Sequence, residues 1–311
     1  VLTLEEIARV ARNFVDLGTE KIRLTGGEPL VRKDILELVK EIGTYGLRDF
    51  AMTTNGSQLT TMAEPLRKAG MHRLNISLDS LDADKFRNIT RTGKLSHVLD
   101  GIDAAREAGF RGIKINTVVM KGRNDEEIPE LIYSINDEEI PELIEFARKK
   151  KVDISFIEEM PLGEISEHDR GLALCTSEEV RDIIRKHHEL VPATEDSGGP
   201  ARYYRMEDSE TRVGFISPHS HNFCSTCNRV RVTARGDVRA CLADRRALSL
   251  RDVMRTGGSD ADLAWGWERT AREELGFVRV GEEAFAIDAP LRTGLPITRS
   301  PWWSNLLPER P

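Results

Sequence analysis

The amino-acid sequence predicts an α/β protein whose first half is a partly open barrel. Short apolar strand candidates alternate with amphipathic stretches up to about residue 161, an order typical of parallel strands joined by crossover helices. The strand candidates also alternate polar and apolar residues, whereas parallel strands covered on both faces read as continuous apolar runs. A barrel with a polar interior explains both observations. A flat sheet with one solvated face is the alternative.

Five strands are expected in this half, at residues 21–24, 49–53, 73–78, 112–120 and 152–157. Between them, apolar residues recur every third and fourth position, which predicts helices over 34–42, 62–69 and 96–108. Gly70 and Gly109 follow two of these helices, as expected of a C-terminal cap.

The pattern changes after Pro161. A helix is predicted over 177–188 with Thr176 or Ser177 as its cap, and short strands are predicted within 203–216. We therefore place a domain boundary near residue 162. It separates a barrel of residues 1–162 from a second, α+β domain of residues 163–311.

Nine residues, NDEEIPELI, occur identically at 124–132 and 136–144. Two copies are too few for a repeat architecture. The second copy runs directly into a helical pattern, so we expect it to form a helix and the first copy to form an extra loop.

The composition of the 311 residues excludes several classes of protein. No apolar run approaches the roughly 18 residues of a membrane-spanning helix. The net charge of −7 argues against general nucleic-acid binding. Four cysteines are too few for a disulfide scaffold, and three of them lie close together, which indicates a metal site in a reducing, cytoplasmic compartment. The chain starts at Val1 without a signal-peptide pattern, so we expect it to begin inside a longer protein.

The strongest motif is a group of three cysteines, Cys224, Cys227 and Cys241. Three thiolates suit either of two kinds of metal centre. One is a tetrahedral zinc completed by His219 or His221. The other is a [4Fe–4S] cluster with one iron open to another ligand. Three buried thiols without metal are the remaining alternative.

Two arginines follow the second cysteine, two positions apart. An extended segment would project Arg229 and Arg231 to one side, where paired guanidinium groups suit phosphate or carboxylate oxygens. This favours the open cluster beside an anionic ligand. The alternative is that both arginines only balance the charge of the thiolates.

Polar motifs end three of the expected strands: TGGEP at 25–29, TTNG at 53–56 and NISLD at 75–79. Each alone is an ordinary turn, but together they predict a shared ligand site at the strand ends. Arg23 and Lys114 are charged residues inside otherwise apolar strands, and each therefore needs a partner or an anionic ligand. A salt bridge to Asp79 or Glu28 is the alternative.

The order TGGEP, TTNG, NISLDS, KINTVVMKG, FIEEMP, CSTCNRVRVT and GDVRACL resembles the GTP 3′,8-cyclase family of radical S-adenosylmethionine (SAM) enzymes in molybdenum cofactor biosynthesis. The resemblance covers about residues 2–242. It implies an incomplete, TIM-like radical SAM barrel followed by an α+β iron–sulfur domain. It also implies conversion of GTP to (8S)-3′,8-cyclo-7,8-dihydroguanosine 5′-triphosphate, on the route to cyclic pyranopterin monophosphate.

The resemblance also implies roles for particular residues. SAM contacts are expected at Gly27, Ser77 and Met160. GTP contacts are expected at Arg23, Thr53, Lys114, Arg229 and Arg231. A C-terminal [4Fe–4S] cluster is expected on Cys224, Cys227 and Cys241. Cyclic pyranopterin monophosphate synthase is the expected downstream partner, and a homodimer is possible in this family.

One departure from the family is plain in the sequence. The CxxxCxxC segment that holds the family's first, SAM-cleaving [4Fe–4S] cluster does not occur in these 311 residues. We therefore expect that cluster only in a full-length protein, and no radical chemistry from this chain alone. Two other readings stay open: a non-catalytic zinc- or nucleotide-binding module, and a peptide-modifying radical SAM relative.

Overall fold

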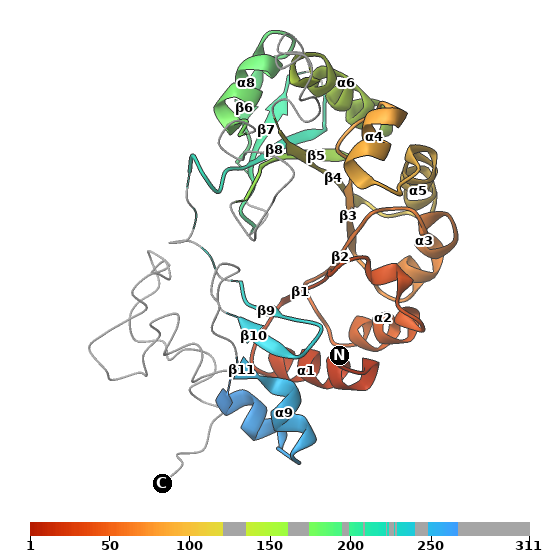
Figure 1. Ribbon diagram of the computed structural model, residues 1–311, viewed down its shortest axis with the longest axis vertical. Coiled ribbons are helices and arrows are strands. Elements are labelled where there is room, and N and C mark those ends of the chain that lie inside the picture. The colour runs from red at the N-terminus through yellow and green to blue at the C-terminus, as the bar shows by residue number, and fades with distance from the viewer. Residues whose placement is uncertain are drawn as a thin grey trace, which may run out of the picture. The chain divides into compact units, whose positions relative to one another are not determined.

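The computed structural model describes residues 1–120, 135–160, 174–194, 199–207, 209–221, 223, 227, 229–239 and 248–266 (Figure 1). Contacts divide the chain into two compact units. The first contains residues 1–50, 69–71 and the described residues after 223, and the second contains residues 51–68 and 72–223. The domain boundary near residue 162 stays a prediction.

The main sheet has eight strands in the order β1-β2-β3-β4-β5-β8-β7-β6, which confirms the α/β class. Its pairs from β2 to β8 are parallel, and β7 and β6 continue it antiparallel. The eight strands are, in chain order, Lys21–Leu24, Asp49–Thr54, Arg73–Ser77, Gly112–Val119, Asp153–Glu158, Leu190–Pro192, Arg202–Met206 and Arg212–Ile216. All five strands expected in the first half are therefore present, with ends shifted by at most one residue.

Helices lie along one face of this sheet in the second unit (Figure 1). They are α3 (Leu59–Lys68), α4 (Ala83–Thr90), α5 (Leu95–Glu107), α6 (Ile135–Lys150) and α8 (Ser177–Arg185). The last two pack on β5. The apolar strand residues facing these helices are buried, and their burial stabilises the fold because it removes hydrocarbon surface from water. They include Leu74, Ile76, Ile113, Ile115, Ile154 and Phe156.

The cap of α8 follows the sequence closely. Thr176 accepts a hydrogen bond from the backbone N–H of Glu179, whose carboxylate in turn accepts from the backbone N–H of Thr176. This reciprocal capping box satisfies two backbone donors that the first helical turn leaves unpaired. Of the two candidate caps, Thr176 is the one used.

The second copy of the nine-residue repeat lies in α6, as predicted. The first copy, at 124–132, lies outside the described residues. No helix in the described part of the chain has the length and apolarity needed to cross a membrane.

The first unit joins residues from both ends of the described chain. Its early elements are α1 (Leu4–Asp16), β1, a 3-10 turn (Pro29–Val31) and α2 (Ile35–Gly43). Its late elements are a small antiparallel sheet of β9 (Arg231–Val232), β10 (Asp237–Arg239) and β11 (Leu248–Ser249), followed by α9 (Leu250–Arg255). Residues 260–266 are also helical.

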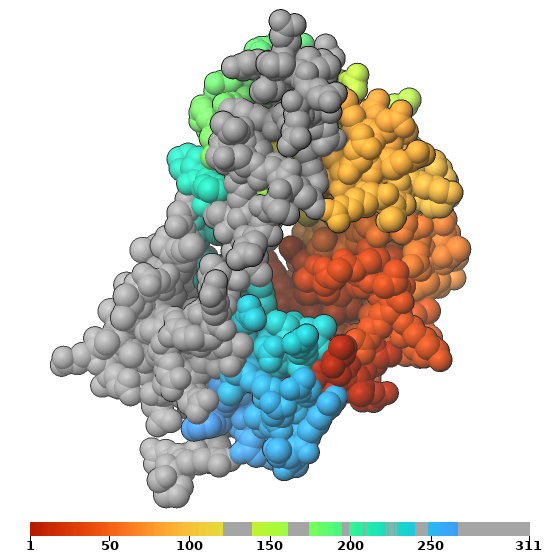
Figure 2. All heavy atoms as spheres, viewed as in Figure 1, coloured from red at the N-terminus to blue at the C-terminus, as the bar shows by residue number. Residues whose placement is uncertain are grey.

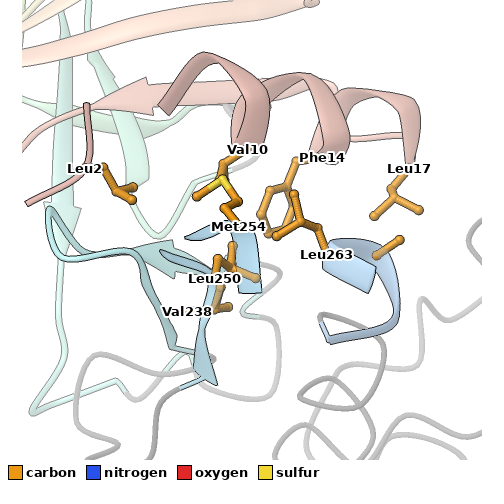
Figure 3. Packing of buried hydrophobic residues seen from close by; sticks show 9 residues of the cluster. Leu2, Val10, Phe14, Leu17, Val238, Leu250, Met254 and Leu263 are labelled. Atoms are coloured by element: carbon orange, nitrogen blue, oxygen red, sulfur yellow. The ribbon is translucent and has the colours of Figure 1, made fainter. Parts of the chain in front are cut away.

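An apolar cluster unites these early and late elements (Figure 3). Val10 and Phe14 of α1 lie in one buried group with Val238 of β10 and with Leu250 and Met254 of α9. In the space-filling view, red residues of α1 lie against blue residues of this late segment (Figure 2). The N-terminal helix thus buries its apolar face on residues more than 220 positions later in the chain.

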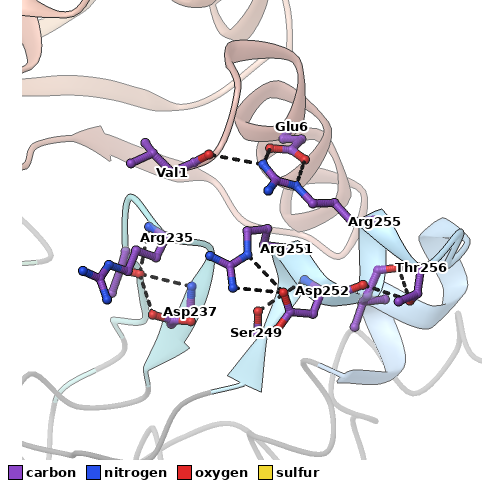
Figure 4. A network of polar contacts seen from close by, with 11 residues as sticks. Val1, Glu6, Arg235, Asp237, Ser249, Arg251, Asp252, Arg255 and Thr256 are labelled. Carbon is purple, nitrogen blue, oxygen red and sulfur yellow. Dashed lines mark hydrogen bonds and ion pairs between the residues drawn. The ribbon is translucent and has the colours of Figure 1, made fainter.

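Polar contacts surround the cluster (Figure 4). Arg255 forms two contacts with the carboxylate of Glu6, at 2.9 and 3.1 Å, and donates to the backbone oxygen of Val1. The hydrogen bond from Arg255 is the main reason that the pKa of Glu6 falls to about 2. Arg9 makes a second clasp, with Asp260 at 2.7 Å and the backbone oxygen of Gly258 at 2.8 Å.

Candidate functional site

Two rows of polar residues cross the face of the sheet opposite the helices. Strand register aligns Thr53 with Asn75, Asn75 with Lys114, and Lys114 with Asp153. Side chains of register partners point to the same side of a sheet, and so do residues two apart on one strand. Four adjacent strands therefore contribute one residue each to this row. The row includes two of the predicted GTP contacts, Thr53 and Lys114.

The second row lies one step nearer the carboxyl ends of the parallel strands. It aligns Ser77, Asn116, Ser155 and Gly214. The predicted SAM contact Ser77 belongs to it. The expected alternation is strict in β4, where half-buried and buried residues follow one another along the whole strand. On β3 and β5 it is lost, because Asn75 and Ser155 of the polar face are also buried, at 1% and 0% exposure.

Three buried polar atoms on these rows lack a hydrogen-bond partner within the described residues. They are Oδ1 of Asn75, Oδ1 of Asn116 and Oγ of Ser155. Asn75 uses its amide nitrogen to donate to Thr53 Oγ1 at 3.4 Å, which leaves the oxygen open. An unpaired buried acceptor costs about 1–3 kcal/mol, so three on one face favour a bound ligand or water as the missing partner.

Lys114 lies among long side chains from other strands. Its ammonium group donates to the Tyr203 hydroxyl at 3.3 Å. The neighbouring Asp153 is engaged by Arg212, which contacts both carboxylate oxygens with its guanidinium and one with its backbone N–H. The predicted alternative partner Asp79 accepts instead from the backbone N–H of Val118 at 2.8 Å.

Glu158 of the FIEEMP motif is a structural centre at the end of β5. Its buried carboxylate accepts from the backbone N–H groups of Ser177, His219 and Ser220, at 2.8 to 3.0 Å, and from the Ser220 hydroxyl. Burial alone would raise the pKa of Glu158, but these hydrogen bonds outweigh burial and hold it below the ordinary value. Glu158 thereby fixes the segment that leads toward the cysteine motif.

The TTNG motif has a packing role as well. Gly56 has a φ of +78°, which favours glycine. Helix α5 approaches it so closely that a Cβ on Gly101 would lie 2.4 Å from the Gly56 backbone oxygen. The two glycines are therefore explained by the fold, independently of any ligand.

Other predicted site residues belong to the first unit. Arg23 is exposed on β1. A Cβ on Gly27 would meet no described atom within 4 Å, so packing does not account for glycine there. Arg229 is half-buried, and Arg231 pairs across the small sheet with Arg239.

Only one of the three motif cysteines is described. Cys227 is half-buried and forms no disulfide, whereas Cys224 and Cys241 lie outside the described residues. Met160, the third predicted SAM contact, is half-buried just after β5. Asn75 belongs to the strand-end motif NISLD, which is predicted to take part in a shared ligand site. Asn116, Ser155, Tyr203 and Arg239 are not predicted as ligand contacts. Of these four, Asn116 and Ser155 carry a signal, as polar positions in alternating strands.

The sequence matches two family models. Residues 1–135 match the radical SAM superfamily, and residues 152–273 match Molybdenum Cofactor Synthesis C. A GTP 3′,8-cyclase of Marinobacter nauticus is 81% identical over 255 residues, which cover 82% of this chain and 74% of that protein. A GTP 3′,8-cyclase of Pseudomonas putida is 54% identical over 277 residues, or 88% of this chain and 78% of that protein.

The chain belongs to the GTP 3′,8-cyclase family. Identity at this level over most of both chains decides it, and it confirms the resemblance drawn from the motifs. A family member of this kind is a radical SAM enzyme.

A solved structure shares the fold. SuiB of Streptococcus suis bound to S-adenosylmethionine aligns with a TM-score of 0.56 at 17% identity. The alignment covers 81% of this chain but only 58% of SuiB. At this identity the comparison shows the fold alone.

Proposed function

We propose that this chain carries the substrate-binding part of a GTP 3′,8-cyclase. The reaction is the conversion of GTP to (8S)-3′,8-cyclo-7,8-dihydroguanosine 5′-triphosphate in molybdenum cofactor biosynthesis. The observation that carries the proposal is the polar sheet face, where Lys114 lies in register near three buried polar atoms that lack a hydrogen-bond partner among the described residues. A ligand with both anionic groups and hydroxyl groups satisfies such a face, and GTP carries both.

Lys114 is proposed to bind the phosphates, with Thr53 on the same row. Arg23, Arg229 and Arg231 are proposed as further GTP contacts, and Gly27, Ser77 and Met160 as SAM contacts. A charge-assisted hydrogen bond contributes roughly 1.5–3 kcal/mol, so each cation is expected to matter separately.

The iron–sulfur centre is proposed on Cys224, Cys227 and Cys241. Three thiols are a suitable donor set for a [4Fe–4S] cluster that leaves one iron open. Such a cluster, when bound, supplies a Lewis-acidic iron that a substrate atom can ligate. Thiolate ligation implies a reducing compartment, which we take to be the cytoplasm.

The SAM-cleaving cluster does not fit the residues given. None of the four cysteines lies in a CxxxCxxC segment, so we assign no step of SAM cleavage to these 311 residues. The product of the proposed reaction still contains a triphosphate and a new ring. A second enzyme, proposed to be cyclic pyranopterin monophosphate synthase, would use it.

The test is anaerobic calorimetry of GTP binding to the reconstituted chain. Lys114→Met is expected to weaken GTP binding at least about tenfold, the loss of one charge-assisted hydrogen bond. Lys150→Met is the matched control, because Lys150 pairs with Asp103 at 2.6 Å in the helical layer. Its GTP affinity should equal that of the unmodified chain.

Absence of GTP binding by folded, iron-loaded protein would contradict the proposal. Equal weakening by both lysine variants would show that total charge, rather than the polar face, governs binding.

A further inference from the structure

Tyr203 occupies an unusual place on the polar face of the second unit. It is 6% exposed and comes from β7, three strands away from Lys114 on β4. Neighbouring strands are about 4.8 Å apart, so only two long side chains reaching toward each other span that interval. The ammonium nitrogen of Lys114 nevertheless lies 3.3 Å from the Tyr203 hydroxyl.

Small residues on the strands between them make this contact possible. Gly214 of β8 is the register partner of both Tyr203 and Ser155. A Cβ on Gly214 would lie 2.9 Å from Tyr203 Cε1 and 2.6 Å from Ser155 Oγ. Glycine at this position therefore lets the tyrosine ring lie across β8 toward β4.

The ring also lies near two cations. The guanidinium carbon of Arg212 is 5.0 Å from the ring centre, and the Lys114 nitrogen is 5.9 Å from it. Both are within the range of a cation–π contact. Arg212 is bound to Asp153, the carboxylate beside Lys114 in the register, so the carboxylate charge is already balanced.

Charged residues of the described strands lie in a row around the tyrosine. Arg205 of β7 lies opposite Arg212 of β8 in the register. Arg212 pairs with Asp153 of β5, which lies opposite Lys114 of β4. Among the described residues of this row three are cationic and one is acidic, a composition that suits an anionic ligand.

We propose that Tyr203 is a positioning residue that holds the ammonium group of Lys114 for the phosphates of the substrate. This inference rests on the proposed function, and it adds a residue from the antiparallel part of the sheet to the nucleotide site. The phenol accepts one proton of an ammonium group that has three, so the contact with Tyr203 does not prevent Lys114 from donating to a phosphate oxygen. Without that hydroxyl, the flexible four-carbon side chain must be ordered when the ligand binds.

The test is GTP binding by Tyr203→Phe, which removes the hydroxyl and keeps the ring. GTP affinity is expected to fall three- to tenfold, while the affinity for guanosine, which lacks phosphates, stays unchanged. In a Lys114→Met background, Tyr203→Phe should change GTP affinity less than twofold. A merely structural tyrosine would weaken both ligands in both backgrounds.

Tyr204→Phe is the matched control, because the Tyr204 hydroxyl accepts from Arg181 at 2.9 Å on the helical side of the sheet. Its GTP affinity should equal that of the unmodified chain. Gly214→Ala is a second variant, which displaces the ring and keeps the hydroxyl. It should weaken GTP binding at least as much as Tyr203→Phe.

Two results would overturn the inference. If Tyr203→Phe and Gly214→Ala bind GTP as the unmodified chain does, Tyr203 has no positioning role and the proposed function still stands. If the unmodified chain does not bind GTP, the proposed function fails, and the inference fails with it.

Discussion

Single residues on the polar face differ in how far the sequence reveals them. Lys114 is conspicuous, because a lysine between isoleucines in a strand needs a partner or an anionic ligand. Tyr203 is not, because the contact joins residues 89 positions apart and depends on the strand order β4-β5-β8-β7. The alternation of β4 could be predicted from the sequence, whereas the partner of its lysine could not.

Glu158 is a second residue whose contacts could not be predicted from the sequence, although its motif is conspicuous. The sequence places it in a motif at a strand end, and the structure gives it four hydrogen bonds from residues 19 to 62 positions later. These donors come from the start of α8 and from residues 219–220. A motif that is predicted to contact a ligand can therefore contain a residue whose hydrogen bonds serve the fold.

We predict that Glu158→Gln lowers the free energy of unfolding at pH 7 by about 2–3 kcal/mol. The glutamine amide lacks the negative charge that strengthens these hydrogen bonds. Its NH₂ group, which is itself a donor, would also face backbone N–H donors. Denaturant unfolding measures this, with the exposed Glu207→Gln as the control, expected within about 0.5 kcal/mol of the unmodified chain.

The pH dependence follows from the lowered pKa of Glu158. Its contribution to stability is complete above the pKa of an ordinary glutamate and is lost as the pH falls through the lower, folded-state pKa. The difference between the unmodified chain and Glu158→Gln should therefore persist at neutral pH and shrink in acid. A difference that stayed constant down to the folded-state pKa would contradict the role of the charge.

At the scale of elements, α1 depends on distant residues. Its capping box at Thr3 and Glu6 could be read from the sequence, but its partner could not. An apolar helix face indicates that another element covers it, but it does not identify that element. In the first unit the cover is β10, α9 and residues 263–264, which follow α1 by more than 220 positions in the chain.

We predict that Leu250→Ala destabilises the first unit by about 2–5 kcal/mol. Leu250 is 1% exposed at the start of α9, and truncation leaves a cavity that the other members of the apolar cluster cannot fill without movement. Val31→Ala is the control, since Val31 is 68% exposed. Hydrogen exchange would localise the effect.

Increased exchange should reach α1 in Leu250→Ala although the substitution lies about 235 residues later. If exchange in α1 is unchanged, the apolar cluster does not couple the two segments.

At the scale of the whole molecule, the order of motifs was informative and single motifs were not. TGGEP, TTNG and the cysteine group each have ordinary explanations, and the structure supplies one for Gly56. Their succession along 240 residues predicted the family that the comparisons then showed. The hydrogen bonds around Glu158 and the packing of α1 on α9 could not be predicted from the sequence, because both depend on contacts between residues far apart in the chain.

The metal centre gives the last prediction. Anaerobically reconstituted chain is expected to bind iron and absorb near ~400 nm, as thiolate-bound iron–sulfur clusters do. Cys227→Ser should lose most of this absorption and iron. Cys175→Ala should keep both, because Cys175 is buried beside the cap of α8, outside the motif.

Stoichiometric zinc without iron uptake would contradict the cluster. It would instead favour the tetrahedral site that His219 or His221 could complete.

The union of α1 with α9 also sets the order of events during synthesis. A ribosome adds about 5–20 residues per second, so the roughly 230 residues between these helices take ~12–46 s to appear. Throughout that interval the apolar face of α1, with Val10 and Phe14, has none of its late partners. Until residue 264 has been synthesised, the nascent chain therefore exposes the apolar face of α1, which chaperones can bind. The first unit can complete its folding only after the second unit has been translated.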